Sequence, residues 1–454
     1  MAFLVILILN CVGLTALFGP AVASTGTVYI RANGSIDPPT SPLQNNGTIY
    51  TLTGDVSSDS NGVVVEKDGV VLDGAGFTIQ GTGTINSFGV GVEGRINVTV
   101  KGTRVEGFQY GINVVDSLNV EIAENVIEEN VVGVLFQNCS FNGILKNEII
   151  DNHDGVDLHS SLNCTVCGNF VAENSLSGLG LCSSQNNTII HNSFVANLQQ
   201  VNSCPNLLNV WNGAYPSGGN WWSKSYNGTD IFEGRFQNIT GSDGIGDATY
   251  VIDNISIDSY PLMGPWIDTG QNITATYSPS ISFTYSNVVS SGVLILNVTH
   301  ATKPAPLGFL FLGAIPVFYD VNTTASYSSS ISITLPYTGV VPNSLAEKNL
   351  VLVQWNETSQ NWDNITTGTD RTDNSISGET SQLSIFTVIV PLFGDINKDG
   401  TVDIYDAILL AGAFNSTPGS PKWNPAADIN KDNVVDIYDA IILASNFGKT
   451  GGAG

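Results

Sequence analysis

Two short segments near the end of the chain carry oxygen-bearing side chains at the same spacing. Residues 395–406 read DINKDGTVDIYD and residues 428–439 read DINKDNVVDIYD, so the two copies start 33 residues apart. Positions 1, 3, 5, 9 and 12 of both copies are Asp or Asn. Ca²⁺ is a hard cation that takes about six to eight oxygen ligands, often from a short, turned loop. The repeat therefore predicts two calcium-binding loops.

The backbone of each loop must turn sharply at position 6, and position 7 would contribute its carbonyl oxygen. Gly400 turns freely, and Asn433 is the next most suitable residue for a left-handed conformation. The aspartates of such a small segment repel one another without cations, so we expect calcium to be required for folding. The predicted ligands are Asp395, Asn397, Asp399, Thr401, Asp403 and Asp406 in the first loop and Asp428, Asn430, Asp432, Val434, Asp436 and Asp439 in the second.

Each loop continues into an apolar stretch, AILLAGAF or AIILASNF, and position 12 is Asp rather than Glu. A loop followed by a helix and duplicated over Gly394 to Gly448 resembles the type I dockerin family. The resemblance implies a calcium-dependent module with two ions that binds a cohesin-bearing partner. Partner contacts in the family often come from loop positions 10 and 11, although packing inside the module is the alternative for these side chains. They are Ile404, Tyr405, Ile437 and Tyr438, whose bulk leaves the class of cohesin open.

The middle of the chain repeats with a period of about 22 residues. Asparagine recurs at 125, 147, 169 and 192, and apolar columns keep the same steps. The segments alternate with period 2 and are rich in β-branched residues, which favours short strands over helices. A solenoid with this period is predicted to be a right-handed parallel β-helix with an asparagine ladder inside its turns. The glycine column is Gly89, Gly111, Gly133, Gly155 and Gly178.

The opening DGVVLDGAGFTIQG and the repeated coil resemble the NosD-like, carbohydrate-binding or sugar-hydrolysis β-helix group. The segment 218–263, GGNWWSKSYNGTD…GSDGIGDATYVI…DSYPLM, is typical of the closing end of such helices. Asp243 and Asp247 in this segment are candidates for a third calcium site, and an acidic turn that caps the helix is the alternative. Cys182 and Cys204 are 22 residues apart and are predicted to be neighbours on adjacent coils.

Residues 267–392 lose the asparagine column and alternate as strands separated by Ser, Thr and Gly turns. Strands at hairpin spacing predict an antiparallel β-sandwich, and the WNETSQNWDNIT hairpin resembles ZU5-like modules. The predicted organisation is a signal peptide at 1–23, a parallel β-helix at 24–266, the sandwich at 267–392, the dockerin at 393–448 and a tail at 449–454. The fold class is mainly β, with a small α-helical module at the end.

One segment of the β-helix resembles a catalytic site. NHDGVDLHSS, residues 152–161, partly resembles the N-x-D-G-x-D stretch of polygalacturonases, in which paired carboxylates cleave glycosidic bonds. Asp154 and Asp157 would then be acid and base. However, Gly155 belongs to the glycine column, and the later acidic, Gly-His-Gly and Arg-x-Lys motifs of that family are missing. An ordinary coil is therefore the preferred interpretation.

Composition limits the partners and indicates the compartment. The net charge of −25 and the pI near 4.1 argue against binding to nucleic acid or to anionic membrane surfaces. FLVILILNCVGLTALF followed by Ala21-Val22-Ala23 predicts a signal peptide, with an uncleaved anchor as the alternative. Asn-x-Ser/Thr sites occur throughout the chain, from Asn33 to Asn415, as expected for an exported, glycosylated protein. No later segment is long and apolar enough to span a membrane.

Together these features predict a secreted or cell-surface modular protein without catalytic activity, whose β-helix contacts glycans or surface polymers. The alternative is a polysaccharide hydrolase or lyase delivered by the same module. A copper-handling protein is a third class, but the 4 His and 2 Met residues argue against it. The sequence does not identify the glycan, the cohesin, the occupancy of the glycosylation sites, the disulfide pairing or the oligomeric state.

Overall fold

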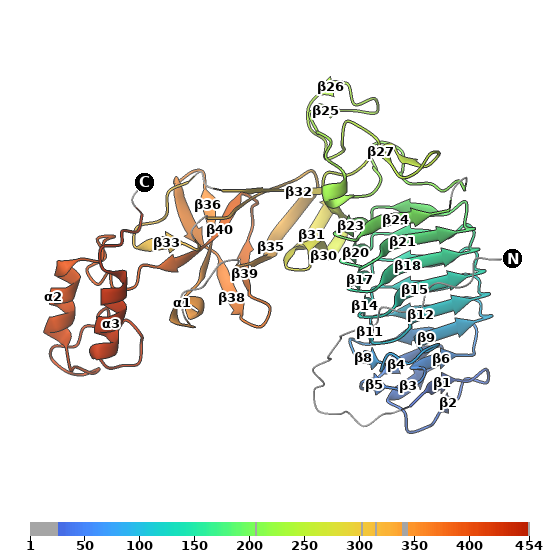
Figure 1. Cartoon of the computed structure of the whole chain (residues 1–454), viewed down its shortest axis with the longest axis horizontal. Helices are drawn as coiled ribbons and strands as arrows, with labels where there is room; N and C mark the ends of the chain where they lie inside the picture. The colour runs from blue at the N-terminus through green and yellow to red at the C-terminus, as the bar shows by residue number, and fades with distance from the viewer. Residues whose placement is uncertain (1–25, 205–206, 301–302, 314–315, 338–343, 453–454) are drawn as a thin grey trace.

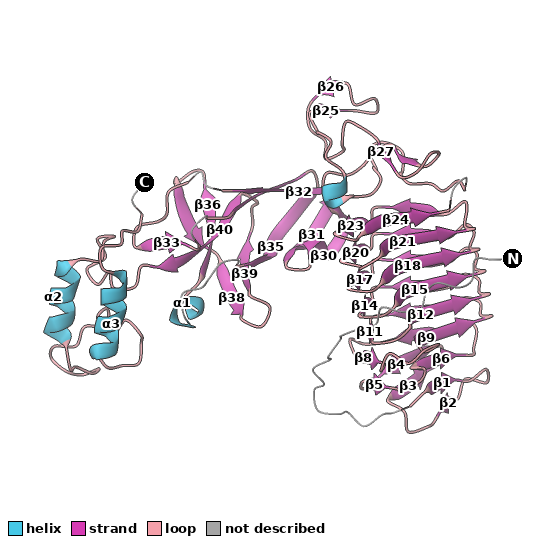
Figure 2. Cartoon of the chain, in the orientation of Figure 1, coloured by secondary structure: helices cyan, strands magenta, loops and turns pink. Residues whose placement is uncertain are grey.

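The computed structural model describes residues 26–204, 207–300, 303–313, 316–337 and 344–452, so the predicted signal peptide lies outside the described residues. The chain forms a β-helix, an antiparallel sandwich and a pair of helices, arranged in this order along the long axis of the molecule (Figure 1). Figure 2 shows that strands dominate the first two modules and that the last is helical. The predicted mainly-β fold class is confirmed.

The β-helix has three sheets, in which each strand pairs in parallel with the equivalent strand of the next coil, apart from β2 and β3 at one end. In spatial order the first sheet is β2 (Ile36–Asp37), β1 (Val28–Ile30), β6 (Val63–Val65), β9 (Phe88–Glu93), β12 (Tyr110–Val115), β15 (Val132–Gln137), β18 (Asp154–His159), β21 (Ser177–Cys182) and β24 (Gln199–Ser203). The second is β22 (Thr188–Ile190), β19 (Thr165–Cys167), β16 (Gly143–Leu145), β13 (Glu121–Ala123), β10 (Thr99–Lys101), β7 (Val71–Asp73), β4 (Ile49–Leu52) and β3 (Leu43–Asn46). The third is β23 (Ser193–Val195), β20 (Phe170–Ala172), β17 (Glu148–Ile150), β14 (Val126–Glu128), β11 (Arg104–Glu106), β8 (Thr78–Gln80) and β5 (Val56–Ser57).

The glycine column marks the places where adjacent coils approach most closely. A Cβ atom on Gly111 would lie 2.5 Å from the carbonyl oxygen of Gly133 and 2.9 Å from Cγ2 of Ile127. Real Cβ atoms do not approach other atoms so closely, and only glycine fits at this position. The two apolar columns that the sequence predicts line the interior of the same coils and are all buried: Val100, Ile122, Ile144, Val166 and Ile189, and Val105, Ile127, Ile149, Val171 and Phe194.

The predicted asparagine ladder lies at the corner between the second and third sheets. Asn125 donates hydrogen bonds from its backbone N–H and its Nδ2 to Oδ1 of Asn147, both at 3.0 Å. The same pair of bonds recurs from Asn147 to Asn169, and the ladder continues to Asn220 across an insertion. The residue before each of Asn125, Asn147, Asn169 and Asn192 has positive φ, for example Lys146 at 55°. The side-chain amides thus satisfy the buried turns that would otherwise lack partners.

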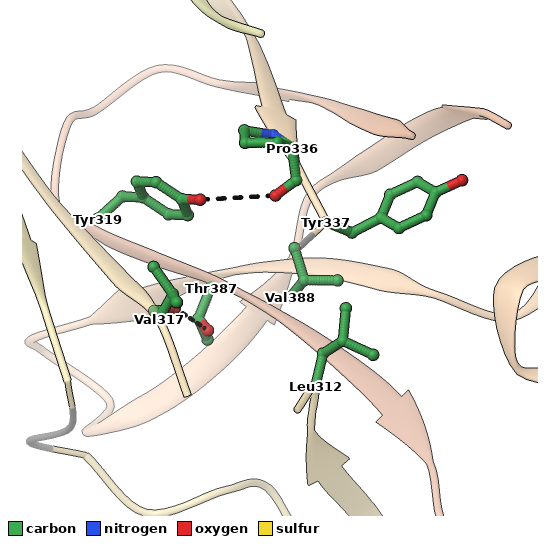
Figure 3. A pocket seen from close by; sticks show the side chains of 7 residues that line it. All are labelled: Leu312, Val317, Tyr319, Pro336, Tyr337, Thr387 and Val388. Atoms are coloured by element: carbon green, nitrogen blue, oxygen red, sulfur yellow. Dashed lines mark hydrogen bonds between the residues drawn. The ribbon is translucent and has the colours of Figure 1, made fainter. Parts of the chain in front are cut away.

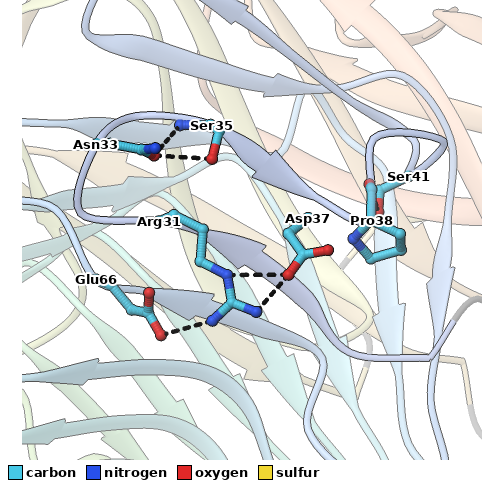
Figure 4. Close-up of polar contacts among 7 residues, drawn as sticks. All are labelled: Arg31, Asn33, Ser35, Asp37, Pro38, Ser41 and Glu66. Atoms are coloured by element: carbon cyan, nitrogen blue, oxygen red, sulfur yellow. Dashed lines mark hydrogen bonds and ion pairs between the residues drawn. The ribbon is translucent and has the colours of Figure 1, made fainter.

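The β-helix is closed at both ends. The antiparallel strands β2 and β3 cover the N-terminal end, where the Arg31 guanidinium pairs with Asp37 and Glu66 (Figure 4). The parallel coils begin with β1, β4 and β5, which pair with β6, β7 and β8. The C-terminal end is covered by η1 (Ser223–Ser225), β25 (Phe232–Glu233), β26 (Ile239–Thr240), β27 (Tyr250–Val251) and β28 (Ile257–Asp258).

The sandwich consists of two antiparallel sheets over a buried apolar core. One contains β29 (Trp266–Ile267), β32 (Gly292–Thr299), β34 (Phe318–Thr323), β40 (Ile385–Pro391), β36 (Val351–Asn356) and β37 (Asn361–Asn364), with β33 (Phe309–Phe311) also paired to β40. The other contains β30 (Gly270–Ser278), β31 (Ile281–Ser290), β35 (Ser326–Pro336), β39 (Ser375–Thr380) and β38 (Thr366–Asp370), and α1 (Ser344–Lys348) precedes β36. The side chains drawn in Figure 3 line a cavity in this module. Its volume of about 10 Å³ has room for about one water molecule and therefore none for an organic ligand. The ZU5 resemblance stays a prediction.

Candidate functional site

The two predicted calcium loops adopt the same conformation. Asp395 accepts hydrogen bonds from the backbone N–H groups of Asp399 and Gly400, at 3.1 and 3.0 Å. The equivalent bonds from Asp432 and Asn433 to Asp428 measure 3.1 and 2.9 Å. Position 6 has positive φ in both loops, as predicted, at 88° for glycine and 70° for asparagine. The shared geometry follows from the shared spacing of the oxygen-bearing side chains.

The last aspartate of each loop connects the loop to the helix that follows. The carboxylate of Asp406 is fully buried and accepts hydrogen bonds from the backbone N–H groups of Ile396, Asn397 and Asp403. Asp403 is the N-cap and forms a capping box with Asp406. Asp439 and Asp436 repeat the arrangement. The helices are α2 (Ile404–Ala413) and α3 (Ile437–Asn446), and they pack around Leu410 and Leu443.

Carboxylate, amide and carbonyl oxygens are the ligands that Ca²⁺ prefers, so the donors of these loops fit the ion. Burial raises the pKa of Asp395, and the charges of Asp406 and Asp399 add to the rise. A divalent cation would offset this repulsion. Within the described part of the chain, no three His, Cys, Asp or Glu side chains cluster closely enough to form a metal site by themselves. The number of bound ions therefore rests on the sequence pattern and on the loop conformation.

The four residues predicted to contact a partner are exposed. Ile404 and Tyr405 are 58% and 64% exposed, and Ile437 and Tyr438 are 56% and 63% exposed. This exposure excludes the alternative that they form the core of the module, which lies around other side chains. Sequence reasoning missed Ile408, Leu409 and Ile441, which extend the exposed apolar surface one helical turn further. Their spacing of four or five residues from the first pair was the signal that could have identified them.

Asp243 and Asp247, the candidates for a third calcium site, accept hydrogen bonds from their own turn. Asp247 accepts from the hydroxyl of Thr229 and from the backbone N–H groups of Ile231 and Phe232. Asp243 accepts from the backbone N–H groups of Gly234 and Ile245. These bonds support the acidic-turn alternative, while the third calcium site stays a prediction.

Asp154 and Asp157 lie on β18, on the outer surface of the first sheet. Asp154 accepts a hydrogen bond from the Ser177 hydroxyl at 2.5 Å, and its other oxygen lies 2.8 Å from Nδ1 of His153. Burial raises the pKa of Asp157, and the charge of Asp154 adds to the rise against the opposing effect of His159. The two aspartates line neither the cavity of Figure 3 nor the cleft described below.

Comparisons with protein families agree with the two resemblances. Residues 22–228 match the model described as periplasmic copper-binding protein (NosD), and residues 393–447 match the type I dockerin domain. Copper favours histidine and sulfur ligands, and among the described residues no group of three or more His, Cys, Asp or Glu side chains is placed to hold a metal ion. No helix of the described structure has the length and hydrophobicity needed to cross a membrane.

Several solved structures are similar to parts of the chain. The mannuronan C-5 epimerase AlgE6 A-module of Azotobacter vinelandii is 19% identical over 34% of this chain and 46% of that protein, with a TM-score of 0.27. A double mutant of the periplasmic alginate epimerase AlgG is 23% identical over 34% of this chain and 38% of its own, with a TM-score of 0.25. Tailspike protein 2 of bacteriophage CBA120 is 8% identical over 75% of this chain and 71% of its own, also at 0.25.

The chain thus spans less than half the length of the two epimerases, and such low TM-scores carry no weight for its function. No curated protein matches the chain. The chain joins a β-helix that matches the NosD family model to a C-terminal segment that matches the type I dockerin model.

Proposed function

We propose that the chain is an exported modular protein that a calcium-dependent dockerin attaches to a cohesin-bearing partner, while the β-helix contacts glycans or surface polymers. The observation that carries the docking role is the exposure of the same apolar pair, Ile-Tyr, at the start of both helices. Large exposed apolar side chains on a small module indicate a protein interface, and tyrosine is enriched at interface centres.

The loop and the apolar pair are coupled through the backbone. Asp403 caps α2 by accepting a hydrogen bond from the N–H of Tyr405 at 2.8 Å, so the loop fixes the first helical turn and the direction of this side chain. Asp436 holds Tyr438 in the same way at the same distance. Calcium would therefore order the surface that the partner contacts, which explains why docking is expected to depend on the ion.

Because the two copies are alike, either helix start can present the same chemistry to the partner. The test uses the full chain, an immobilised cohesin-bearing protein and millimolar calcium. Replacing both residues of one copy, Ile404→Ser with Tyr405→Ser, is expected to weaken binding by less than about tenfold if the second copy substitutes for the first. Replacing both copies is expected to abolish binding. A quadruple variant that folds and still binds like wild type would refute the proposal.

A polysaccharide-cleaving enzyme is the second candidate, because Asp157 has a raised pKa beside the carboxylate of Asp154. Glycoside hydrolysis usually employs a pair of carboxyl groups, of which the one with a raised pKa acts as the acid. Asp154→Asn and Asp157→Asn should be assayed against a panel of polysaccharides. Cleavage that either substitution abolishes would favour the enzyme, and the docking role would then deliver it to its substrate.

A further inference from the structure

A cleft of about 500 Å³ lies between the β-helix and the sandwich. One side is a corner of the β-helix, where Glu124, Lys146, Gly168 and His191 occupy equivalent positions on successive coils. The other side is β30, the edge strand of the smaller sandwich sheet. Figure 1 shows β30 beside the third sheet of the β-helix. Ligand sites of this size are common at the boundary between two modules.

Specific contacts between the two modules hold the walls of the cleft in place. Lys146 Nζ lies 2.7 Å from Oδ2 of Asp268, whose other oxygen accepts a hydrogen bond from Nε1 of Trp266 at 2.9 Å. The ring of Trp266 stacks on His191, with ring centroids 4.1 Å apart and planes within 9°. An apolar cluster that joins Phe170 and other side chains of the third sheet to Val293 of the sandwich lies alongside. The cleft is therefore a built feature of the fold.

Several polar groups of the cleft lack protein partners. Among the described residues, none donates a hydrogen bond to the side chain of the half-buried Glu148, on which only the charge of Arg104 acts favourably. The exposed side-chain amides of Gln271 and Asn272 have no protein partner and are open to a ligand. Burial raises the pKa of Glu148, as expected for a carboxyl group that has lost water without gaining a donor. A partly buried polar group without a partner is costly, and a ligand that supplies hydroxyl groups would satisfy it.

The charge of the cleft restricts the ligand. Its lining contains the carboxyl groups of Glu124, Glu148 and Asp268 but only one lysine, Lys146. Burial lowers the pKa of His191, which disfavours its charged form. The surplus of negative charge disfavours uronates, phosphates and sulfates. Amides, a carboxyl group and the rings of Phe170 and Trp266 together suit a molecule with many hydroxyl groups and an apolar ring face.

We propose that this cleft between the modules binds a segment of a neutral oligosaccharide, with Glu148, Gln271 and Asn272 accepting and donating hydrogen bonds to its hydroxyl groups. This inference rests on the glycan-binding part of the proposed function and assigns it a location and a charge class. It does not depend on the docking part. The ligand would contact both modules at once, so the contacts between β-helix and sandwich would form part of the binding site.

The test is isothermal titration of the full chain with cello-, xylo-, manno- and N-acetylglucosamine oligomers, and with a galacturonate oligomer as the anionic comparison. Gln271→Trp obstructs the cleft, and Gln137→Trp makes the same change at an exposed position on the first sheet. At least one neutral oligomer is expected to bind, with an affinity lowered more than tenfold by Gln271→Trp and left unchanged by Gln137→Trp. Glu148→Gln should weaken binding about fivefold while leaving the thermal unfolding of the chain unchanged.

Different failures have different meanings. Unaltered binding by a folded Gln271→Trp variant would overturn the inference, and a loss caused by Gln137→Trp instead would leave glycan binding on the outer surface of the first sheet. Binding of galacturonate as tight as that of the neutral oligomers would overturn the assignment of a neutral ligand. If wild type binds no oligomer, both the inference and the glycan part of the proposed function fail, while calcium-dependent docking is measured separately.

Discussion

Asn147 offers the sharpest test of how the β-helix is held together. Its side chain is 2% exposed and takes part in four hydrogen bonds. Oδ1 accepts the backbone N–H and Nδ2 of Asn125, both at 3.0 Å. Nδ2 donates to the carbonyl of Ile122 at 2.8 Å and to Oδ1 of Asn169 at 3.0 Å. Asn147→Ala removes all four bonds and leaves the buried N–H of Asn125 without an acceptor.

The expected cost follows from these bonds. An unsatisfied buried donor costs about 1–3 kcal/mol, and each of the three further lost bonds costs about 1 kcal/mol, which gives roughly 4–6 kcal/mol in the free energy of unfolding. Gln137→Ala is the control in the same coil, because this residue is exposed, and it should change the stability by less than about 0.5 kcal/mol.

Two measurements check the prediction. Denaturant unfolding gives the change in stability, and hydrogen–deuterium exchange of a peptide covering residues 120–130 reports the protection of the Asn125 amide. The variant should lose protection first in this peptide, because the opened coil exposes its own turn. A variant that keeps both its exchange protection and its stability to within 1 kcal/mol would refute the ladder as a source of stability.

Three further predictions concern other parts of the chain. Calcium at about 100 times its dissociation constant should stabilise the helical module by about 2.7 kcal/mol per ion, and Asp406→Ala should remove this gain from its loop. Calorimetry with and without chelator measures the stabilisation, and identical unfolding curves would contradict the prediction. Oxidised glutathione should link Cys182 to Cys204, whose sulfur atoms are 3.2 Å apart, before it modifies Cys164, because burial raises the pKa of Cys164 to about 11. Peptide mapping would show the disulfide bond. Modification of Cys164 before this bond forms would contradict the prediction. Burial raises the pKa of Asp258 to about 6, above its unfolded value, so its contribution to stability is present at low pH and is lost as the pH rises through 6. The stability of the wild type, measured relative to Asp258→Asn, should therefore fall by about 1 kcal/mol between pH 5 and pH 7. An equal pH dependence of the two proteins would disprove this role.

The repeating part of the fold could be predicted because each coil repeats the same contacts. Glycine at the close approach and asparagine at the corner are set by neighbours 22 or 23 residues away, so spacing alone identifies them. The extension of the ladder to Asn220 could not be predicted, because an insertion changes the step to 28 residues. The first coil was harder to identify, since the step from β1 to β6 is 35 residues, although β4 keeps the 22-residue step to β7.

The candidate site was predictable where ligands follow a fixed pattern within one segment. The loops fold as the spacing of their oxygen-bearing side chains indicates. The structure further shows that the last aspartate of the loop takes part in the capping box at the start of the helix. Whether Ile404 and Tyr405 are buried could not be decided from the sequence, because adjacent apolar residues at a helix start fit either a core or an interface. The cleft was invisible because it brings Glu148 together with Gln271, far apart in the chain and without a shared motif.

Calcium-dependent docking is the central claim, and one measurement tests it most directly. The full chain is passed over an immobilised cohesin-bearing protein in millimolar calcium and again with chelator, with the Asp406→Ala and Asp439→Ala double variant as the control. The account predicts retention in calcium, release by chelator and no retention of the variant. A chain whose helical module folds with calcium but is never retained, or one that is retained equally in chelator, would contradict it.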